Sequence, residues 1–338
     1  MNKRISTSVF AILVLAWFTS AAAYAQEIPT FTQFYISGGQ LFAATMAGDF
    51  PVLGNTTHIP VTLVPLTVIF EPGGQVFDPL QIVSHGDSPV SFVLKSPLFK
   101  AATFDKHPET NDAPTQWLDA YQRANFWSTI TGGTSRNNPV KRDFHILLDT
   151  PQVAPWFLAV PAWEGSVDKD SNGDPNGHIN WPFFDQEVRA LLPLFPAKGL
   201  TIFLLGHIDF PNWSNGGPNS VAGGYHLHMG NQTYIVDGFD FNGPDVEGLS
   251  HELAEWLADP FISSTTPGWR KTASSDCSHR MEVGDPMHGH VVEMQFHGDT
   301  FHLEDLAFLS WFAPDQPSTA INGWRTFFNS DVPHLSCQ

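Results

Sequence analysis

The residues best suited to catalysis lie in one segment, residues 245–260, which reads DVEGLSHELAEWLADP. His251 and Glu255 are four positions apart, so on a helix their side chains point to the same side. Two side chains with this spacing can hold one metal ion, and the acid that follows the first ligand can polarise a water on that ion. The segment therefore predicts His251 and Glu255 as metal ligands and Glu252 as the catalytic base.

The HExxE pattern resembles the HExxH helix of zinc peptidases, with Glu255 in place of the second histidine. A carboxylate makes the ligand set harder and more anionic, so Zn²⁺ is expected, with Mn²⁺, Fe²⁺ or Ca²⁺ as alternatives. The competing interpretation is an amphipathic surface helix whose acidic side is only solvated.

The elements that must position this motif can be read from hydrophobic spacing. Asp245 is suited to cap the helix and Pro260 to end it. Apolar residues recur every three or four positions and predict one buried side: Val246, Leu249, Leu253 and Trp256 or Leu257. Elsewhere, the patterns predict strands at residues 60–70, 143–148, 156–160, 200–205 and 225–236, and helices at residues 113–130 and 183–195.

This order of elements predicts an α+β fold. Residues 26–130 are expected to form a β-rich N-terminal region. Residues 131–338 are expected to form a zincin-like mixed sheet with an active-site helix, because a helix, a strand and a hairpin precede the HExxE segment in the order of zincins. Whether the two regions form one continuous domain stays open.

Three motif blocks resemble a named family. They are GYH at residues 224–226, SHELAE at residues 250–255 with DP after it, and EVGD at residues 282–285. In the Exordium, or phosphate-induced protein, family and its bacterial secreted relatives, the blocks read GYH or GWH, SHELAE with DP, and EIGD. The resemblance covers roughly residues 200–290. It implies an extracellular protein and, through HExxE, a metallohydrolase.

The resemblance also extends the candidate site. By its position in the family block, Glu282 is the favoured third metal ligand. Asp285 is a further ligand candidate or a group that orients His251. His226, or alternatively His228, is placed to stabilise an oxyanion, with a buried strand histidine as the competing interpretation. The other ligand candidates are His279, His288 and His290.

A polar loop at residues 168–177 predicts a second cation site. Asp168, Asp170, Asn172 and Asp174 place oxygen side chains at alternate positions, with Gly173 at the sixth. An EF-hand loop wraps Ca²⁺ with this spacing, although Ile179 stands where the bidentate Glu belongs. The alternative is a solvated turn.

Composition limits the partners and the compartment. Lys and Arg number 16 against 34 Asp and Glu, a net charge of −18, which excludes nucleic-acid binding through basic side chains. Lys3 and Arg4, the apolar run 9–18 and the Ala23-Tyr24-Ala25 site predict a cleaved signal peptide at residues 1–25. We therefore expect a secreted or periplasmic protein without membrane insertion. In such a compartment, the two cysteines, Cys277 and Cys337, are expected to form a disulfide.

Together these features predict a secreted zinc metallopeptidase that hydrolyses a protein or peptide substrate with a metal-activated water. The alternative is a non-catalytic extracellular or cell-surface binding protein in which the same helix holds a structural ion.

Overall fold

The computed structural model describes residues 28–82, 86–104, 114–132, 143–212, 221–240, 243 and 245–337. The expected signal peptide, residues 1–25, lies outside the described residues. The described part is a mixed α+β structure with several sheets, so the broad fold class is confirmed. Within these ranges, no helix combines the length and apolar character needed to cross a bilayer.

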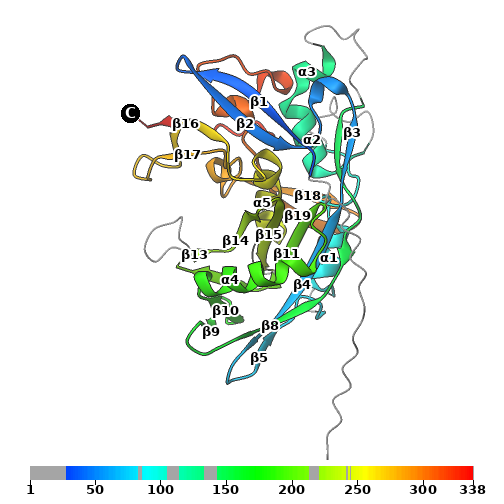
Figure 1. Cartoon of the computed structure of the whole chain (residues 1–338), viewed down its shortest axis with the longest axis vertical. Coiled ribbons are helices and arrows are strands. Elements are labelled where there is room, and N and C mark those ends of the chain that lie inside the picture. Colours follow the sequence, from blue (N-terminus) through cyan, green and yellow to red (C-terminus); the bar gives the residue numbers. More distant parts are fainter. Residues whose placement is uncertain are drawn as a thin grey trace, which may run out of the picture.

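A seven-stranded sheet forms the centre of the structure (Figure 1). Its strands, in spatial order, are β14 (Gly224–Met229), β15 (Gln232–Phe239), β11 (Leu200–Gly206), β4 (Val61–Phe70) and β5 (Gln75–Phe77), and β7 (Gln152–Val153) and β8 (Trp156–Val160) also pair with β4. β11 is parallel to β15 and β4, whereas β14 is antiparallel to β15. β4, β11 and β15 are buried along most of their length, which explains their continuous apolar sequences.

Two helices cover opposite faces of this sheet. They are α4 (Trp181–Leu191) and α5 (Glu247–Ala258). Ile202 and Leu204 of β11 share a core cluster with Leu253 of α5, whereas Phe203 packs in a separate cluster with Phe184 of α4. This alternation follows from the two-residue period of a strand. The motif helix is therefore held by its apolar side against one face of the sheet.

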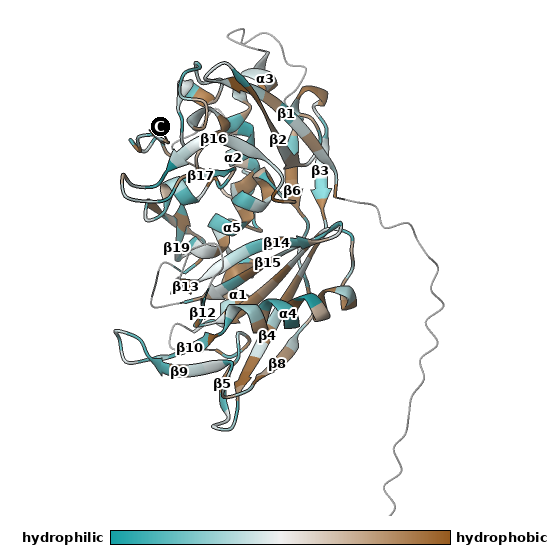
Figure 2. Ribbon diagram, turned by 60° about the vertical axis from the view of Figure 1, so that its left-hand side comes forward, coloured by the Kyte–Doolittle hydropathy of each residue, from teal (hydrophilic) through white to brown (hydrophobic). Residues whose placement is uncertain are grey.

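The other strands form smaller sheets around this centre. They are β1 (Thr30–Ser37), β2 (Gln40–Ala47), β3 (Thr56–Ile59), β6 (His145–Leu148), β9 (Gly165–Lys169), β10 (Pro175–Ile179), β12 (Ile208–Pro211), β13 (Val221–Ala222), β16 (Thr265–Arg270), β17 (Ser278–Arg280), β18 (Val291–Phe296), β19 (Asp299–Glu304) and β20 (Leu335–Ser336). The remaining α-helices are α1 (Pro89–Lys95), α2 (Trp117–Asn125) and α3 (Trp127–Thr131). Besides the central sheet, α5 packs against β2 and β19. Figure 2 shows apolar residues along β4, β8 and β15, and polar residues along much of the β9–β10 hairpin.

The two regions expected from the sequence share their structure. β4 comes from residues 26–130, yet it lies in the same sheet as β11 and β15. One core cluster also extends along the chain from Ile28 to Phe327. The N-terminal region is therefore packed into the same core as the HExxE helix.

The predicted strands and helices are present in the structure, with differences in length and in helix continuity. The strand predictions at 60–70, 156–160, 200–205 and 225–236 correspond to β4, β8, β11 and the β14–β15 hairpin, and residues 143–148 contain the shorter β6. The helix expected at 113–130 is instead two helices, α2 and α3. Thr115 pairs with Ala102 in a β-bridge, which delays the first helix to Trp117, and Phe126 leaves the helical backbone region between them. The helix expected at 183–195 begins at Trp181 and ends as a short 3-10 turn, Leu192–Leu194.

Candidate metal centre

Helix α5 carries the HExxE residues, and its apolar side is packed into the core. Val246, Leu249 and Leu253 are buried against the core, as the spacing predicted. The helix ends at Ala258, just before Pro260. The N-cap residue is Val246 and not Asp245, whose carboxylate instead accepts hydrogen bonds from Val246 and from His302 of β19. Asp245 thus links the helix start to a neighbouring strand.

The motif side chains meet one histidine from the sheet. Nε2 of His251 lies 3.0 Å from Oε1 of Glu255. Nδ1 of His226, on β14, lies 3.2 Å from Oε2 of Glu252 and 3.6 Å from Oε2 of Glu255. The β14–β15 hairpin is therefore beside the helix, as the sequence required for His226 to take part in the site. His228, two residues further on, bonds the carbonyl of Gly230 and belongs to none of the donor groups described below.

The loop that follows β17 closes the other side of the site. The Glu282 side chain is hydrogen-bonded to the Glu255 carboxylate. The backbone N–H groups of Gly284 and Asp285 donate to Oε1 of Glu255 at 3.3 and 3.2 Å. The EVGD block thus contacts the second motif residue through one side chain and two main-chain donors.

Three groups of ligand atoms are compact enough to hold a cation. In each group the donor atoms lie within 4.8 Å of one another: His226, Glu255 and Glu282; His251, Glu252 and Glu255; and His251, His288 and Glu304. Glu255 belongs to two of these groups, and His251 also belongs to two. The structure therefore brings together His226, His251, Glu252, Glu255 and Glu282, all of which the sequence assigned to the site.

The structure places Asp285 differently from the sequence prediction, which made its carboxylate a metal ligand or the partner of His251. The carboxylate of Asp285 belongs to none of the three donor groups found among the described residues. Nδ1 of His251, which Asp285 was expected to orient, instead contacts Oε2 of Glu304 on β19. Asp285 contributes through its backbone N–H because the 3-10 turn at Asp285–Met287 aims its main chain at Glu255. Glu304 is the one site residue that sequence reasoning missed, and nothing in its local sequence distinguishes it from an ordinary strand carboxylate.

The charges of the site are strongly coupled. Although burial opposes ionisation, the charge and hydrogen bond of His251 hold the pKa of Glu255 at about 2. Burial, with repulsion from Glu255 and Asp285, raises the pKa of Glu282 well above its ordinary range. Burial also raises the pKa of Glu252, against the opposing hydrogen bond from His226. In the metal-free protein, Glu282 is therefore the protonated partner in its hydrogen bond with Glu255.

The residues of the expected calcium loop form a tight turn between β9 and β10. Oδ1 of Asp170 accepts the backbone N–H groups of Asn172 and Asp174 at 2.9 and 2.8 Å. Asp168 lies on β9, and its carboxylate contacts His178 across the hairpin at 3.0 Å. None of the donor groups in the described part of the chain includes this loop. The geometry matches the alternative interpretation, in which the polar side chains stabilise the turn itself.

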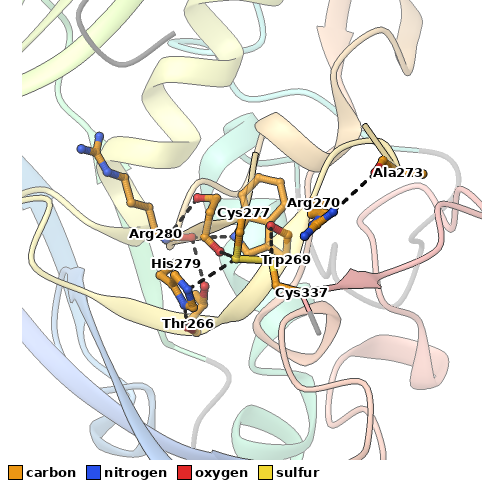
Figure 3. The surroundings of a disulfide bond; sticks show 9 residues. Thr266, Trp269, Arg270, Ala273, Cys277, His279, Arg280 and Cys337 are labelled. Carbon is orange, nitrogen blue, oxygen red and sulfur yellow. Dashed lines mark hydrogen bonds between the residues drawn. A yellow bond between two sulfur atoms is a disulfide. The ribbon is translucent and has the colours of Figure 1, made fainter. Parts of the chain in front are cut away.

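Cys277 and Cys337 form the expected disulfide, with Sγ atoms 2.13 Å apart (Figure 3). The bridge ties the C-terminal β20 region to the segment before β17, on either side of β16. Nε2 of His279 lies 3.4 Å from Sγ of Cys277, and this histidine belongs to none of the donor groups found among the described residues. β17 ends two residues before Glu282, so the disulfide anchors the strand that leads into the site.

Comparison with known proteins finds no matching family model, no matching curated protein and no matching solved structure. The chemical capability of the site therefore rests on its own geometry. Imidazole nitrogens and carboxylate oxygens converge on Glu255, and a further carboxylate, Glu252, lies beside them. Such a set can bind a divalent cation and accept a proton next to it.

Proposed function

We propose that this protein is an extracellular divalent-metal-dependent hydrolase, and that its substrate is a peptide bond. His251, Glu255 and Glu282 would hold the ion, and Glu252 would act as general base. The observation that carries the proposal is the convergence of two donor groups on Glu255, one through His251 and Glu252, the other through His226 and Glu282. Zn²⁺ is the preferred ion because imidazole and carboxylate ligands suit its tetrahedral site.

The balance of buried charge supports a cation at this position. Glu252, Glu255 and Glu304 are each less than a tenth exposed, and the imidazoles of His226, His251 and His288 are the basic side chains that lie within 4 Å of them in the described structure. Buried carboxylates are costly unless they are paired or coordinate a metal. Nε2 of His226 is also buried, with no hydrogen-bond partner among the described residues. A divalent ion beside Glu255 would offset the excess negative charge.

The chain's own residues have distinct roles in this proposal. A bound divalent ion lowers the pKa of water and polarises a carbonyl oxygen. Glu252 accepts a proton from the attacking water and returns it to the leaving amine. His226 donates to Glu252 and so holds that carboxylate in place. The N–H groups of Gly284 and Asp285 hold Glu255 in the same way.

A second candidate function has support from the same geometry. The two donor groups that share Glu255 together hold more than three candidate ligands, and a closed four-ligand set is typical of structural zinc. Phe157 and Trp163 are 64% and 81% exposed, so large aromatic surfaces are available for binding elsewhere. These observations favour a non-catalytic extracellular or cell-surface binding protein with a structural ion.

The motif blocks add to the first proposal. Their resemblance to the Exordium family and its secreted bacterial relatives would place the chain among extracellular proteins. The disulfide between Cys277 and Cys337 is compatible with such a location.

The experiment that tests the proposal combines metal analysis with one substitution. Protein purified without a metal-affinity tag should contain one equivalent of divalent metal and should cleave a mixed fluorogenic peptide library. Glu252→Gln should retain the metal and lose turnover by a factor of at least ~10², the contribution typical of a general base. Glu293→Gln is the matched control, because this side chain is 74% exposed on β18.

The results of this experiment distinguish the hydrolase from the binding protein with a structural ion. Metal-free wild-type protein, or a Glu252→Gln variant as active as its parent, contradicts the hydrolase proposal. A tightly held ion without turnover in wild type favours the structural ion of the binding protein.

A further inference from the structure

Glu304 links the end of β19 to two successive residues of the motif helix. Its side chain is completely buried, and Oε2 is hydrogen-bonded to Nδ1 of His251. Its backbone N–H donates to Oγ of Ser250 at 3.0 Å, and the same hydroxyl donates to the carbonyl of Glu247. One residue of β19 therefore fixes both the position of α5 and the direction of the His251 ring.

The backbone of Gly284 also lies close to the His251 ring, beside the same nitrogen. A Cβ atom at Gly284 would lie 2.5 Å from Nδ1 of His251 and 2.7 Å from its Cγ. The imidazole is thus packed against the Gly284 backbone and held by the Glu304 carboxylate. In this orientation Nε2 faces Glu255 at 3.0 Å.

We propose that Glu304 is a positioning residue of the metal centre, acting through His251; this inference rests on the proposed function. A neutral imidazole carries one N–H and one lone pair. With Nδ1–H donated to Glu304, the lone pair is fixed on Nε2, where it faces the proposed ion. A carboxylate partner also makes the ligating nitrogen more basic.

A second cation beside Glu304 is the competing explanation. Oε1 of Glu304 is buried without a hydrogen-bond partner in the described structure, and it lies 3.8 Å from Nδ1 of His288. Such a cation would use Nδ1 of His251, the nitrogen that contacts Oε2 of Glu304. The two explanations therefore differ in the protonation of Nδ1 and in the number of ions bound, and both can be measured.

The test measures zinc affinity by competition with a chelator in Glu304→Gln. Glutamine keeps the shape of the side chain and a hydrogen-bond acceptor, but it removes the charge. We expect affinity to fall ~10- to 100-fold, as for other residues that orient metal ligands, with one zinc bound at saturation. Asp305→Asn is the matched control, since this neighbouring buried carboxylate accepts hydrogen bonds from Leu306, Thr326 and Phe328 in the described structure. It should leave affinity unchanged.

A double substitution separates positioning from general support of the fold. In a His251→Ala background, Glu304→Gln should cause no further loss of zinc affinity, because its effect passes through the missing imidazole. An equal loss in both backgrounds overturns the proposal. Should Glu304→Gln fail to fold, long-range ¹H–¹⁵N spectra of the zinc-loaded wild type decide the question. Protonation of His251 at Nδ1 supports the proposal, and protonation at Nε2 contradicts it.

The remaining outcomes distinguish this inference from the proposed function. Unchanged zinc affinity in Glu304→Gln rejects the positioning role alone. Two zinc ions in wild type, with one lost in Glu304→Gln, identify Glu304 as a ligand of a second site and also reject that role. Absence of zinc binding in wild type overturns the proposed function and this inference together.

Discussion

Asp237 shows how a single residue beside the site is constrained by its surroundings. It lies on β15, only 3% exposed, and Oδ2 has no hydrogen-bond partner among the residues described. A Cβ atom at Gly248 would lie 2.8 Å from Oδ1, so only glycine on α5 leaves room for this carboxyl. Burial, and to a lesser extent the charge of Glu252, raise the pKa of Asp237 from 3.8 to about 8. Asp237 is therefore protonated in the folded metal-free protein at neutral pH.

This shift predicts a pH-dependent stability that Asp237→Asn removes. Between pH 3.8 and about 8, the folded protein holds a proton on Asp237 that the unfolded chain has lost, so this residue's contribution to stability falls as pH rises. Asp237→Asn lacks this proton linkage, so its stability relative to wild type should rise with pH. The difference in free energy of unfolding, variant minus wild type, should increase by roughly 1.4 kcal/mol for each pH unit in this window. Urea unfolding of the metal-free proteins measures it.

Gln152→Asn supplies the control for this measurement, because it changes an exposed side chain that carries no charge. Its stability curve should be parallel to that of wild type. A parallel curve for Asp237→Asn would mean that Asp237 does not hold its proton in the folded state.

At the scale of elements, three segments far apart in sequence enclose the motif helix. β14 supplies His226, β19 supplies Glu304, and the loop before the 3-10 turn supplies Gly284. Gly284 both donates to Glu255 and lies against the His251 ring. The glycine of the EVGD block therefore allows this loop to pack closely against α5.

The substitution Gly284→Ala tests whether this close packing is needed. The added methyl would lie under 3 Å from ring atoms of His251, so the loop or the ring must move. We expect a loss of about 1–3 kcal/mol in the free energy of unfolding, as for other overpacked sites, with at least tenfold weaker zinc binding. Denaturant unfolding and chelator competition measure the two effects. Gly223→Ala is the control because no atom lies within 4 Å of its added Cβ, and equal behaviour of the two variants would refute the packing argument.

At the scale of the whole molecule, a shared core and one disulfide connect the site to the rest of the chain. The core cluster beside α5 contains residues from both ends of the described sequence. The disulfide closes a sequence separation of 60 and joins β20 to the segment that leads into Glu282. The C-terminal residues therefore support the loop that carries Glu282 of the candidate metal centre.

Replacing both cysteines measures how much the disulfide contributes to the stability of the fold. In the chain-entropy model, a bridge that closes a loop of this length stabilises the fold by about 4 kcal/mol. Cys277→Ser with Cys337→Ser should lose about this much free energy of unfolding in urea. A reductant should lower the stability of wild type toward that of the variant, and it should leave the variant itself unchanged. Equal stability of oxidised wild type and variant would rule out a stabilising bridge.

The sequence was sufficient where local patterns determine the structure. The HExxE helix follows from three- and four-residue apolar spacing, and the buried strands β4 and β11 follow from continuous apolar sequences. The prediction of one helix at residues 113–130 was less accurate. Thr115 forms a β-bridge with Ala102, a contact between residues distant in sequence, and this bridge delays the start of the helix. Glu282 and His226 were reached through motif blocks, and the structure brings both to Glu255.

By itself, the sequence determined the helix, its paired donors His251 and Glu255, and the pairing of the two cysteines. Local spacing and the number of cysteines are enough for these features. Only the tertiary structure decided that Glu304 contacts His251, that Asp285 contributes its backbone, and that the oxygen-rich loop is a hairpin turn. His251 and Glu304 are 53 positions apart, and their contact depends on how β19 packs against α5. No local pattern of residues encodes that packing, because it is set by the core that all the elements share.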